Sequence, residues 1–358
     1  MERRTRKKVI GGTVIKNLKE IVGLQRYFRV PAELMRRMGG YSPFPLLIVI
    51  YVTLRCNMKC EMCSQKKEYL AGEAGERNPM SWEEWESLID NIQKSFLIKP
   101  FIHLIGGETL LFPHISKLLG SLKERGFKVS MTTNGLALKQ NIPLVLDSNL
   151  WHMNISLDGP AEIHDKVRGV PDAFRRIMEA VSLLQQRKRE MKLKKPRVCI
   201  NCVVTPDNLK VLPEVVQIAH DVGVDSMSFQ HLIFTAQEFQ AHDKIDVPLL
   251  LKSMEEIERS QNGIPITFFP RVTEGKLKPY YQDITHNFGD FCVTPWYRFD
   301  IFPDGEVRTC RQVFGNVRTG ESLKTIWNGK GFRAFRKSLV KQGLHLPWCV
   351  RCCHRQYA

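Results

Sequence analysis

Residues 51–63 read Tyr-Val-Thr-Leu-Arg-Cys-Asn-Met-Lys-Cys-Glu-Met-Cys, and this stretch decides how the rest of the chain is interpreted. Its three cysteines, Cys56, Cys60 and Cys63, have the spacing C-x3-C-x2-C. An apolar, β-branched run, residues 47–54, comes directly before them and is typical of a buried strand. We therefore expect three thiols on a short loop at the carboxyl end of a strand.

Three thiolates from one loop can bind three irons of a [4Fe–4S] cluster, because such clusters are held by cysteine thiolates. The fourth iron then has no ligand from the loop, and an iron with an open position is a site for chemistry. The alternatives are a zinc site or thiols without a metal. Zinc prefers four nitrogen or sulfur ligands, often as two C-x2-C pairs. No fourth ligand is close in the sequence, so the spacing favours iron–sulfur.

With this spacing after its first strand, the chain resembles the radical S-adenosylmethionine (SAM) superfamily. The resemblance implies that SAM binds the open iron through its amino and carboxylate groups. It also implies that one electron from the cluster cleaves SAM to methionine and a 5′-deoxyadenosyl radical, which abstracts a substrate hydrogen. The family commonly has an aromatic residue before the third cysteine, where this chain has Met62. A thioether is large and soft enough to pack in its place.

Apolar runs and helical patterns alternate from residue 47 onward. Strands are expected at 47–54, 101–105, 127–133, 151–157, 197–204 and 225–232. Helices are expected at 81–95, 114–125, 140–147, 172–189 and 211–222. This α/β alternation predicts a parallel sheet with right-handed crossovers. The resemblance implies a partial (β/α)6 TIM-like barrel, whose chemistry gathers at the carboxyl ends of the strands.

Polar residues and glycines follow the expected strand ends. The second strand ends in Gly106-Gly107-Glu108, where glycines permit close approach of a ligand to the backbone. Four polar side chains of the fourth strand share one face by the period of two. Such a face needs a ligand or a water network, because buried polar groups must be paired. The four are His152, Asn154, Ser156 and Asp158.

The resemblance carries SAM-binding roles to several of these positions. The Gly-Gly-Glu run matches the one that binds the SAM amino group. Arg168, in a His-Asp-x-x-Arg-Gly segment, would pair with the SAM carboxylate, for which a planar guanidinium is suited. Asn134 and Ser156 match residues that touch the methionyl and ribose parts. By its face on the fifth expected strand, Asn201 is expected to reach the bound nucleoside. The cofactor-binding residues expected are Gly106, Gly107, Glu108, Asn134, Ser156, Asp158, Arg168 and Asn201.

The sixth expected strand ends in Gln230 and His231, the two candidates for catalytic or substrate-contacting residues. Only one of them points into the barrel, and the period of two favours Gln230, which shares a face with Ser226 and Ser228. A lone histidine is more often structural than catalytic.

Cysteines return near the carboxyl terminus. Strands at 297–302 and 306–309, joined at Asp304-Gly305, predict a hairpin, with a helix at 322–340 after it. This region resembles the twitch domain, the short form of the SPASM domain, in which four cysteines bind an auxiliary [4Fe–4S] cluster. The matching cysteines are Cys292, Cys310, Cys349 and Cys352, with Cys353 as the alternative to Cys352. A four-cysteine zinc ribbon is the other interpretation.

The expected division of the chain has four parts: a basic amphipathic extension (1–45), the barrel (46–235), a linker with a helix at 247–260 and a strand near 266–269 (236–290), and the auxiliary cluster domain (291–358). Residues 1–38 hold eleven Lys or Arg against three Glu, and so carry +8 of the net charge of +16. One interpretation is that this segment lies on an anionic membrane surface or binds an acidic partner. The other is that it packs on the barrel with its charges in solvent.

Bulk composition, with 43% apolar and 25% charged residues, is ordinary for a soluble globular protein. The ten cysteines group at metal-type spacing without a secretory signal, which predicts the reducing cytoplasm, with peripheral membrane contact through 1–38. The sequence has no stripe of interleaved aromatic and basic residues, so we expect no nucleic-acid partner.

The expected function is that of a radical SAM oxidoreductase. It would oxidise a small molecule by two electrons, with the auxiliary cluster taking the second electron and a reductant such as flavodoxin or ferredoxin supplying the first cluster. A peptide-modifying radical SAM enzyme is the first alternative, and it is ranked lower because no separate peptide-recognition domain is visible. A non-enzymatic zinc-binding scaffold is the alternative from another class.

Overall fold

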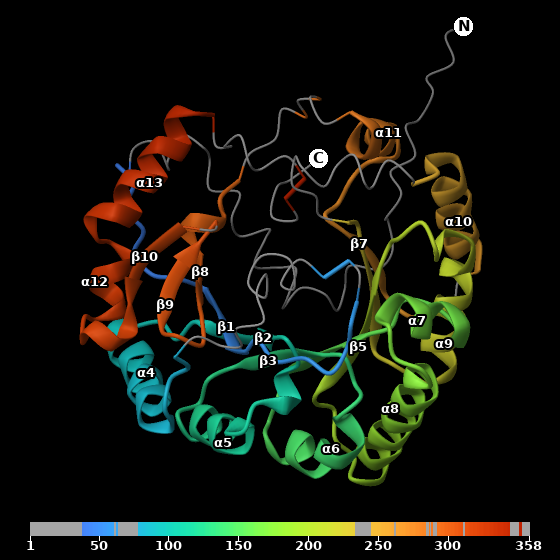
Figure 1. The fold of residues 1–358 in the computed structure, drawn as a ribbon, viewed down its shortest axis with the longest axis horizontal. Helices are drawn as coiled ribbons and strands as arrows, with labels where there is room; N and C mark the ends of the chain where they lie inside the picture. The colour runs from blue at the N-terminus through green and yellow to red at the C-terminus, as the bar shows by residue number, and fades with distance from the viewer. Residues whose placement is uncertain are drawn as a thin grey trace, which may run out of the picture.

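A computed structural model describes residues 38–60, 62–63, 78–232, 245–260, 263–283, 286, 288, 292–310, 312–343 and 351–352. The described strands form one ten-stranded sheet in the order β10-β9-β8-β1-β2-β3-β4-β5-β6-β7. Every neighbouring pair from β8 through β1 to β7 is parallel, and β8-β9 and β9-β10 are antiparallel. Figure 1 shows helices α4, α5, α6, α8, α9 and α10 around the outside of the curved sheet, which is the predicted partial barrel.

The strands are β1 Leu47–Thr53, β2 Phe101–Gly106, β3 Val129–Thr133, β4 His152–Ser156, β5 Arg197–Val203, β6 Ser226–Gln230, β7 Ile266–Phe269, β8 Arg298–Ile301, β9 Glu306–Thr309 and β10 Gln312–Asn316. The helices are α4 Trp82–Ser95, α5 Ile115–Glu124, α6 Leu138–Asp147, α7 Ala161–Arg168, α8 Ala173–Glu190, α9 Leu212–Asp221, α10 Val247–Ser260, α11 Glu274–Gln282, α12 Leu323–Trp327 and α13 Lys330–Lys341. All six strands and all five helices predicted for the barrel are present, as are the linker helix and strand.

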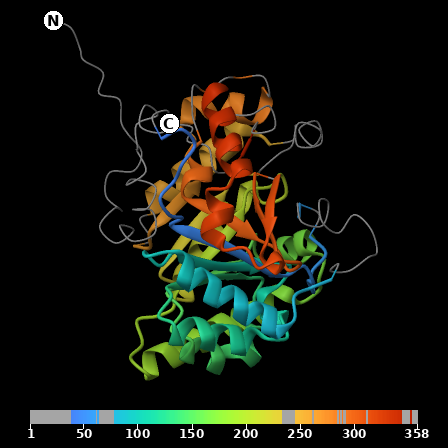
Figure 2. The ribbon, with the colours of Figure 1, turned by 90° about the vertical axis from the view of Figure 1, so that its left-hand side faces the viewer.

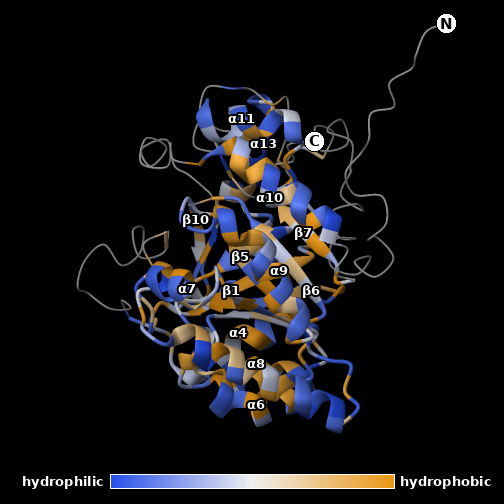
Figure 3. Ribbon diagram, turned by 90° about the vertical axis from the view of Figure 1, so that its right-hand side faces the viewer, coloured by the Kyte–Doolittle hydropathy of each residue, from blue (hydrophilic) through white to orange (hydrophobic). Residues whose placement is uncertain are grey.

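Helix α4 shows how local sequence produces these elements. The Ser81 hydroxyl accepts a hydrogen bond from the Glu84 backbone N–H, and the Glu84 carboxylate accepts one from the Ser81 N–H, which makes a capping box. The helix then buries one apolar stripe against the sheet, formed by Trp85, Leu88, Ile89 and Ile92. Figure 3 shows the same arrangement around the barrel. The hydrophobic strands lie at the centre, and the helices that surround them carry hydrophilic residues on their outer side.

The C-terminal hairpin extends the barrel sheet. Strand β8 pairs in parallel with β1, from Leu47 opposite Arg298 to Ile50 opposite Ile301. Figure 2 shows the orange and red C-terminal elements beside the blue strand β1. The predicted unit 291–358 therefore supplies strands to the same sheet as the predicted unit 46–235, and the division into four parts stays a prediction.

Three local features differ from the sequence-based expectation. Helices α7 and α11 were not predicted. Helix α7 buries only His164, Val167 and Arg168, and helix α11 is 9 residues long with Pro279 inside it, so its short stripe of Leu277, Tyr280 and Tyr281 gave a weak signal. The helix predicted at 322–340 is two helices, α12 and α13. The break occurs at Asn328, whose side-chain amide exchanges hydrogen bonds of 3.0 and 2.8 Å with the Ser42 backbone.

Within the residues that the structure describes, no helix is long and apolar enough to cross a membrane. Residues 1–37 lie outside that part of the chain, so the membrane-surface contact predicted for 1–38 stays a prediction, as does cytoplasmic localisation.

Candidate functional site

The three thiols of the opening loop lie close to one another after β1. Burial raises the pKa of Cys56, and the charges of Glu108, Cys60 and Cys63 raise it further, so these groups are near neighbours. Burial also raises the pKa of Cys60, which Arg168 partly opposes. The Cys56 and Cys60 thiols therefore stay protonated at neutral pH, whereas a bound metal cation would deprotonate them.

Two glycines at the end of β2 hold the cysteine loop in place. The Gly107 N–H donates to the Thr53 carbonyl at 2.7 Å, and the Glu108 N–H donates to the Arg55 carbonyl at 2.8 Å. A Cβ atom on Gly106 would lie 2.2 Å from the Thr53 oxygen, and one on Gly107 would lie 2.2 Å from the Arg55 oxygen. From the sequence, we expected these glycines to permit close approach of a ligand. The structure shows that the backbone of the cysteine loop is what approaches them closely.

Glu108 is a buried carboxylate that joins the ends of β2 and β3. It accepts hydrogen bonds from the Leu110 N–H at 3.0 Å, the Thr133 hydroxyl at 2.6 Å and the Asn134 N–H at 2.6 Å. Burial raises its pKa, and these hydrogen bonds work against that rise. Glu108 therefore has a structural duty, and its contact with the SAM amino group stays a prediction.

Asn134 connects the end of β3 to the cysteine loop. Its side-chain amide donates to the Asn57 oxygen at 2.7 Å and approaches the Cys56 sulfur at 3.8 Å. The structure thus brings Asn134 to the thiols, at the position expected of a residue that touches a ligand bound there.

Arg168 lies at the end of α7, beside the cysteine loop. Its Nε donates to Asp158 Oδ2 at 2.6 Å, and its Nη1 approaches the Cys60 sulfur at 3.7 Å. The Lys59 N–H donates to the Arg168 carbonyl at 3.0 Å, which ties the loop to the helix. A guanidinium fixed next to the thiols is well placed to bind a carboxylate ligand.

The contact of Asp158 with the cofactor stays a prediction, and the structure shows another role for this side chain. Its side chain has no exposed surface, one oxygen pairs with Arg168, and the other accepts from the Val203 N–H at 2.8 Å. Asp158 therefore orients Arg168. Ser156 and Asn201 lie opposite each other on β4 and β5, Ser156 buried and Asn201 partly exposed, and their contacts with SAM stay predictions.

Two members of the polar face predicted on β4, His152 and Asn154, belong to a hydrogen-bond network inside the barrel, although the buried Nδ1 of His152 has no partner in the described structure. His103 on β2 contacts the Ser130 hydroxyl at 2.6 Å and the Thr132 hydroxyl at 3.2 Å. Asn154 donates to Thr132 at 3.4 Å and contacts His152 at 2.9 Å. Burial, aided by Arg298, lowers the pKa of His103 to about 3, so it is neutral at pH 7. Sequence reasoning missed His103, although a polar residue within an apolar strand is a usable signal.

The two candidates on β6 have different environments. Gln230 is half-buried on the same face as Ser228, which is the inner face expected from the period of two. His231 is fully buried among Phe268, Tyr280 and Tyr281, and its Nδ1 contacts the Tyr281 hydroxyl at 2.6 Å. Burial lowers the pKa of His231 to about 4. The structure therefore shows His231 enclosed and Gln230 facing inward, and a catalytic role for either residue stays a prediction.

The C-terminal cysteines gather in a second, apolar environment. Cys310 and Cys352 pack against a cluster of Val293, Trp296, Phe335 and Leu339, and Cys292 is buried next to Val293 in the chain. Cys310 adopts a left-handed conformation with φ of +49°, which is uncommon for a residue other than glycine. Cys349 and Cys353 lie outside the described residues, so the choice between Cys352 and Cys353 is not tested.

Arg351 anchors the segment that carries Cys352. Its buried guanidinium donates to the backbone oxygens of Pro279, Tyr280 and Asp283, at the end of α11. Where the structure describes side chains, no three His, Cys, Asp or Glu groups surround a single point as one metal ion requires. A [4Fe–4S] cube is larger than one ion, and each thiolate binds a different iron, so the thiols of one cluster need not surround a single point.

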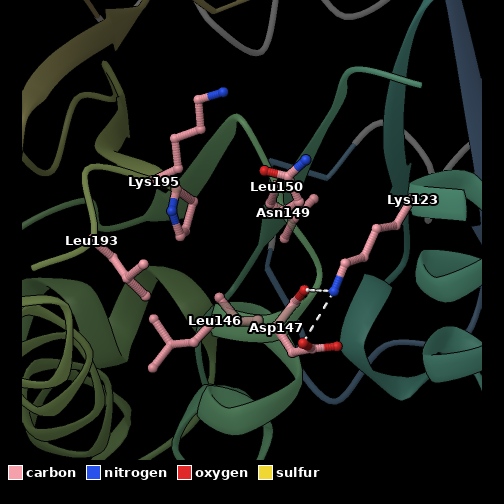
Figure 4. A pocket seen from close by; sticks show the side chains of 9 residues that line it. Lys123, Leu146, Asp147, Asn149, Leu150, Leu193 and Lys195 are labelled. Carbon is pink, nitrogen blue, oxygen red and sulfur yellow. Dashed lines mark hydrogen bonds and ion pairs between the residues drawn. The ribbon is translucent and has the colours of Figure 1, made fainter. Parts of the chain in front are cut away.

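One cavity of about 280 Å³ lies at the opposite end of the barrel from the cysteine loop. Figure 4 shows Lys123 paired with Asp147 at its edge, with a distance of 3.0 Å between Lys123 Nζ and Asp147 Oδ1. The lining comes from the segments that precede β4 and β5. Since barrel enzymes place their chemistry at the carboxyl ends of strands, this cavity is separate from the candidate site.

A parallel barrel with thiols at the tip of its first strand is the architecture of an enzyme that works through an iron–sulfur cluster. The chain belongs to the radical SAM superfamily, which it matches over residues 50–219, and residues 292–353 match the SPASM iron–sulfur cluster-binding domain. It is a radical SAM enzyme that depends on SAM and a [4Fe–4S] cluster, with a SPASM auxiliary iron–sulfur cluster. Membership of this enzyme family excludes the alternative of a non-enzymatic zinc-binding scaffold.

Several characterised proteins are similar to it. The tungsten-containing aldehyde ferredoxin oxidoreductase cofactor-modifying protein of Pyrococcus furiosus is 26% identical over 86% of this chain and 87% of its own length. PqqA peptide cyclase of Bradyrhizobium diazoefficiens is 22% identical over 85% of this chain and 78% of its own length. The structure of Streptococcus suis SuiB bound to its precursor peptide SuiA matches with a TM-score of 0.64 at 17% identity, over 90% of this chain and 73% of SuiB. At this identity the match supports the fold alone.

Proposed function

We propose that this enzyme abstracts a hydrogen atom from a polar substrate held inside the barrel and oxidises it by two electrons overall. The observation that carries the proposal is the pairing of β8 with β1. Strand β1 leads into the first cysteine loop, and β8 follows Cys292 closely in the chain. One continuous inner wall therefore connects the two cysteine sets, and a substrate on that wall would lie between them.

When bound, SAM and the first cluster supply the radical that abstracts hydrogen, and the auxiliary cluster supplies an acceptor for the second electron. The chain's own residues hold and orient these groups. Cys56, Cys60 and Cys63 would ligate the first cluster, and Arg168 would bind the SAM carboxylate while Asp158 fixes its orientation. The ligands of the auxiliary cluster would be Cys292, Cys310, Cys349 and Cys352. The remaining contacts with SAM would come from Gly106, Gly107, Glu108, Asn134, Ser156 and Asn201.

The inner wall carries charged groups suited to a polar substrate. On β8, Phe299 packs outward on Trp327 of α12, so Arg298 and Asp300 point inward. These two side chains form an ion pair with a distance of 2.7 Å between Arg298 Nε and Asp300 Oδ1. A substrate with hydrogen-bond donors and acceptors would replace the solvent around this ion pair, whereas an apolar one would exclude that solvent without offering hydrogen bonds in its place.

A two-electron oxidation also releases a proton, and the wall offers an acceptor for it. Gln230 has no titratable group and can only orient a substrate. His231 is enclosed on the outer side of β6. The partly exposed carboxylate of Asp300 is therefore the base that we assign, with Gln230 as an orienting residue.

A peptide substrate is the second candidate, and the similarity to PqqA peptide cyclase over most of both chains favours it. Both candidates are tested by anaerobic reconstitution with SAM and a reductant, followed by mass spectrometry of small-molecule and peptide fractions. One product that has lost two hydrogen atoms per 5′-deoxyadenosine supports the proposal, and the fraction containing it decides the substrate class. A product that gains a methyl group or retains both hydrogens contradicts it.

A further inference from the structure

Arg336 on α13 is a fully buried cation. Its Nε donates to the Pro295 carbonyl at 2.7 Å, and its Nη1 donates to the carbonyls of Trp327 at 2.9 Å and Gly40 at 3.1 Å. The guanidinium carbon lies 4.0 Å from the centre of the Trp327 ring and 4.7 Å from that of Phe332. No carboxylate pairs with it among the residues the structure describes.

Two other enclosed cations of the described structure have a carboxylate partner. Arg168 pairs with Asp158, and Arg298 pairs with Asp300. Arg336 has carbonyl dipoles and aromatic faces, which stabilise a buried charge only in part. Burial lowers the pKa of Arg336 to about 9, so it is still charged at neutral pH. Its buried Nη2 has no hydrogen-bond partner in the described structure, which leaves the charge incompletely compensated.

The position of this charge relates it to the second cysteine set. Pro295, which accepts from Arg336, belongs to the turn that follows Cys292. On the same face of α13, Phe335 and Leu339 belong to the apolar cluster against which Cys310 and Cys352 pack. The guanidinium is thus tied to the backbone three residues after one cysteine, on the helix that covers two others.

We propose that Arg336 is a positioning residue that compensates the negative charge of the auxiliary cluster and raises its reduction potential. A [4Fe–4S] cluster with four thiolates is a net anion, and one-electron reduction makes it more negative without breaking a bond. Potentials of such clusters depend on net charge, hydrogen bonding and burial. A fixed buried cation nearby favours the reduced form, which makes the cluster a better acceptor for an electron from the substrate. The inference rests on the cluster ligands proposed above.

The test is a redox titration of the full-length, anaerobically reconstituted enzyme, followed by EPR, with iron and sulfide measured in each sample. Arg336→Gln should lower the midpoint potential of the auxiliary cluster and leave that of the first cluster unchanged. Arg336→Lys keeps the charge and should stay closer to the parent. Lys337→Gln is the matched control, because it removes one positive charge from an exposed position on the same helix and should change neither potential.

A second variant covers the case in which Arg336→Gln loses its cluster. Asn328 Oδ1 lies 3.4 Å from Arg336 Nη1, so Asn328→Asp places a carboxylate against the guanidinium without changing side-chain size. It should lower the auxiliary potential in the same direction. An unchanged auxiliary potential in a variant with both clusters intact overturns the inference, as does an equal shift for Lys337→Gln. A parent enzyme with about four irons instead of about eight overturns the proposed ligands instead.

Discussion

The two cysteine regions of this molecule are built differently. The first has three thiols on one short loop, surrounded by polar groups from three strand ends and a helix end, among them Glu108, Asn134 and Arg168. The second draws its cysteines from separate segments and packs them with apolar and aromatic side chains. The first arrangement suits a cluster that binds an exchangeable polar ligand, and the second suits a closed cluster that only transfers electrons.

Loss of a thiol in the first region should have the largest effect. Cys60→Ala removes one of three thiolates, which leaves an iron without a ligand and the cube labile. Cleavage of SAM to 5′-deoxyadenosine should fall to background, measured by chromatography after anaerobic reconstitution. Cys199→Ala, at a buried cysteine on β5 outside both sets, is the control and should keep cleavage. Parent-level cleavage by Cys60→Ala would remove the loop from the active site.

Loss of thiols in the second region should separate SAM cleavage from product formation. Cys310→Ala with Cys349→Ala should leave SAM cleavage but abolish the oxidised product, because only the acceptor of the second electron is lost. Iron should fall by about half, as one of two cubes disappears. Since metal sites also hold domains together, circular dichroism must first show a folded variant. A folded variant with full iron and full turnover would show that these cysteines ligate no cluster.

Glu108 tests whether the polar ring of the first region binds SAM. Glu108→Ala would remove the predicted charge-assisted hydrogen bond to SAM, worth about 1.5–3 kcal/mol. SAM affinity should therefore fall roughly 10- to 100-fold, measured by EPR titration of the intact cluster. The same change leaves the Leu110, Thr133 and Asn134 donors without an acceptor, so thermal stability should fall as well. Glu83→Gln, at an exposed carboxylate of α4, is the control. An unchanged affinity would leave Glu108 with its structural role alone.

The sequence predicted the barrel and its first cysteine loop because both depend on short-range patterns. Apolar β-branched runs mark the strands, and the spacing of Cys56, Cys60 and Cys63 is informative by itself. Helix α7 carries no apolar stripe, so periodicity could not detect it. The pairing of β8 with β1 joins residues about 250 positions apart, and no local pattern contains that information.

The same limit explains the corrections within the site. The period of two placed Asp158 and Ser156 on one face, but it could not show that the chain beyond β4 folds back to pair Asp158 with Arg168. The period of two also placed Gln230 on the inner face of β6, where it lies half-buried with Ser228. It could not show the aromatic cluster around His231, which depends on α11, a helix that the sequence did not predict.

The smallest expected effect is a loss of folding stability at acidic pH. This loss should act on the second cysteine region before the first. His231 contacts Tyr281 of α11, and the end of the same helix holds Arg351, next to Cys352 in the chain. The folded-state pKa of His231, about 4, lies below its ordinary value of 6.5, so the unfolded chain binds more protons between these values. Stability therefore falls as pH decreases from 6.5 towards 4, at about 1.4 kcal/mol per pH unit for one histidine. In urea unfolding at pH 7.5 and 5.5, His231→Phe should lose less stability between the two values than the parent. His220→Gln, at an exposed histidine of α9, is the control and should behave as the parent does. An equal loss for parent and His231→Phe would show that His231 does not couple acid to this side of the barrel.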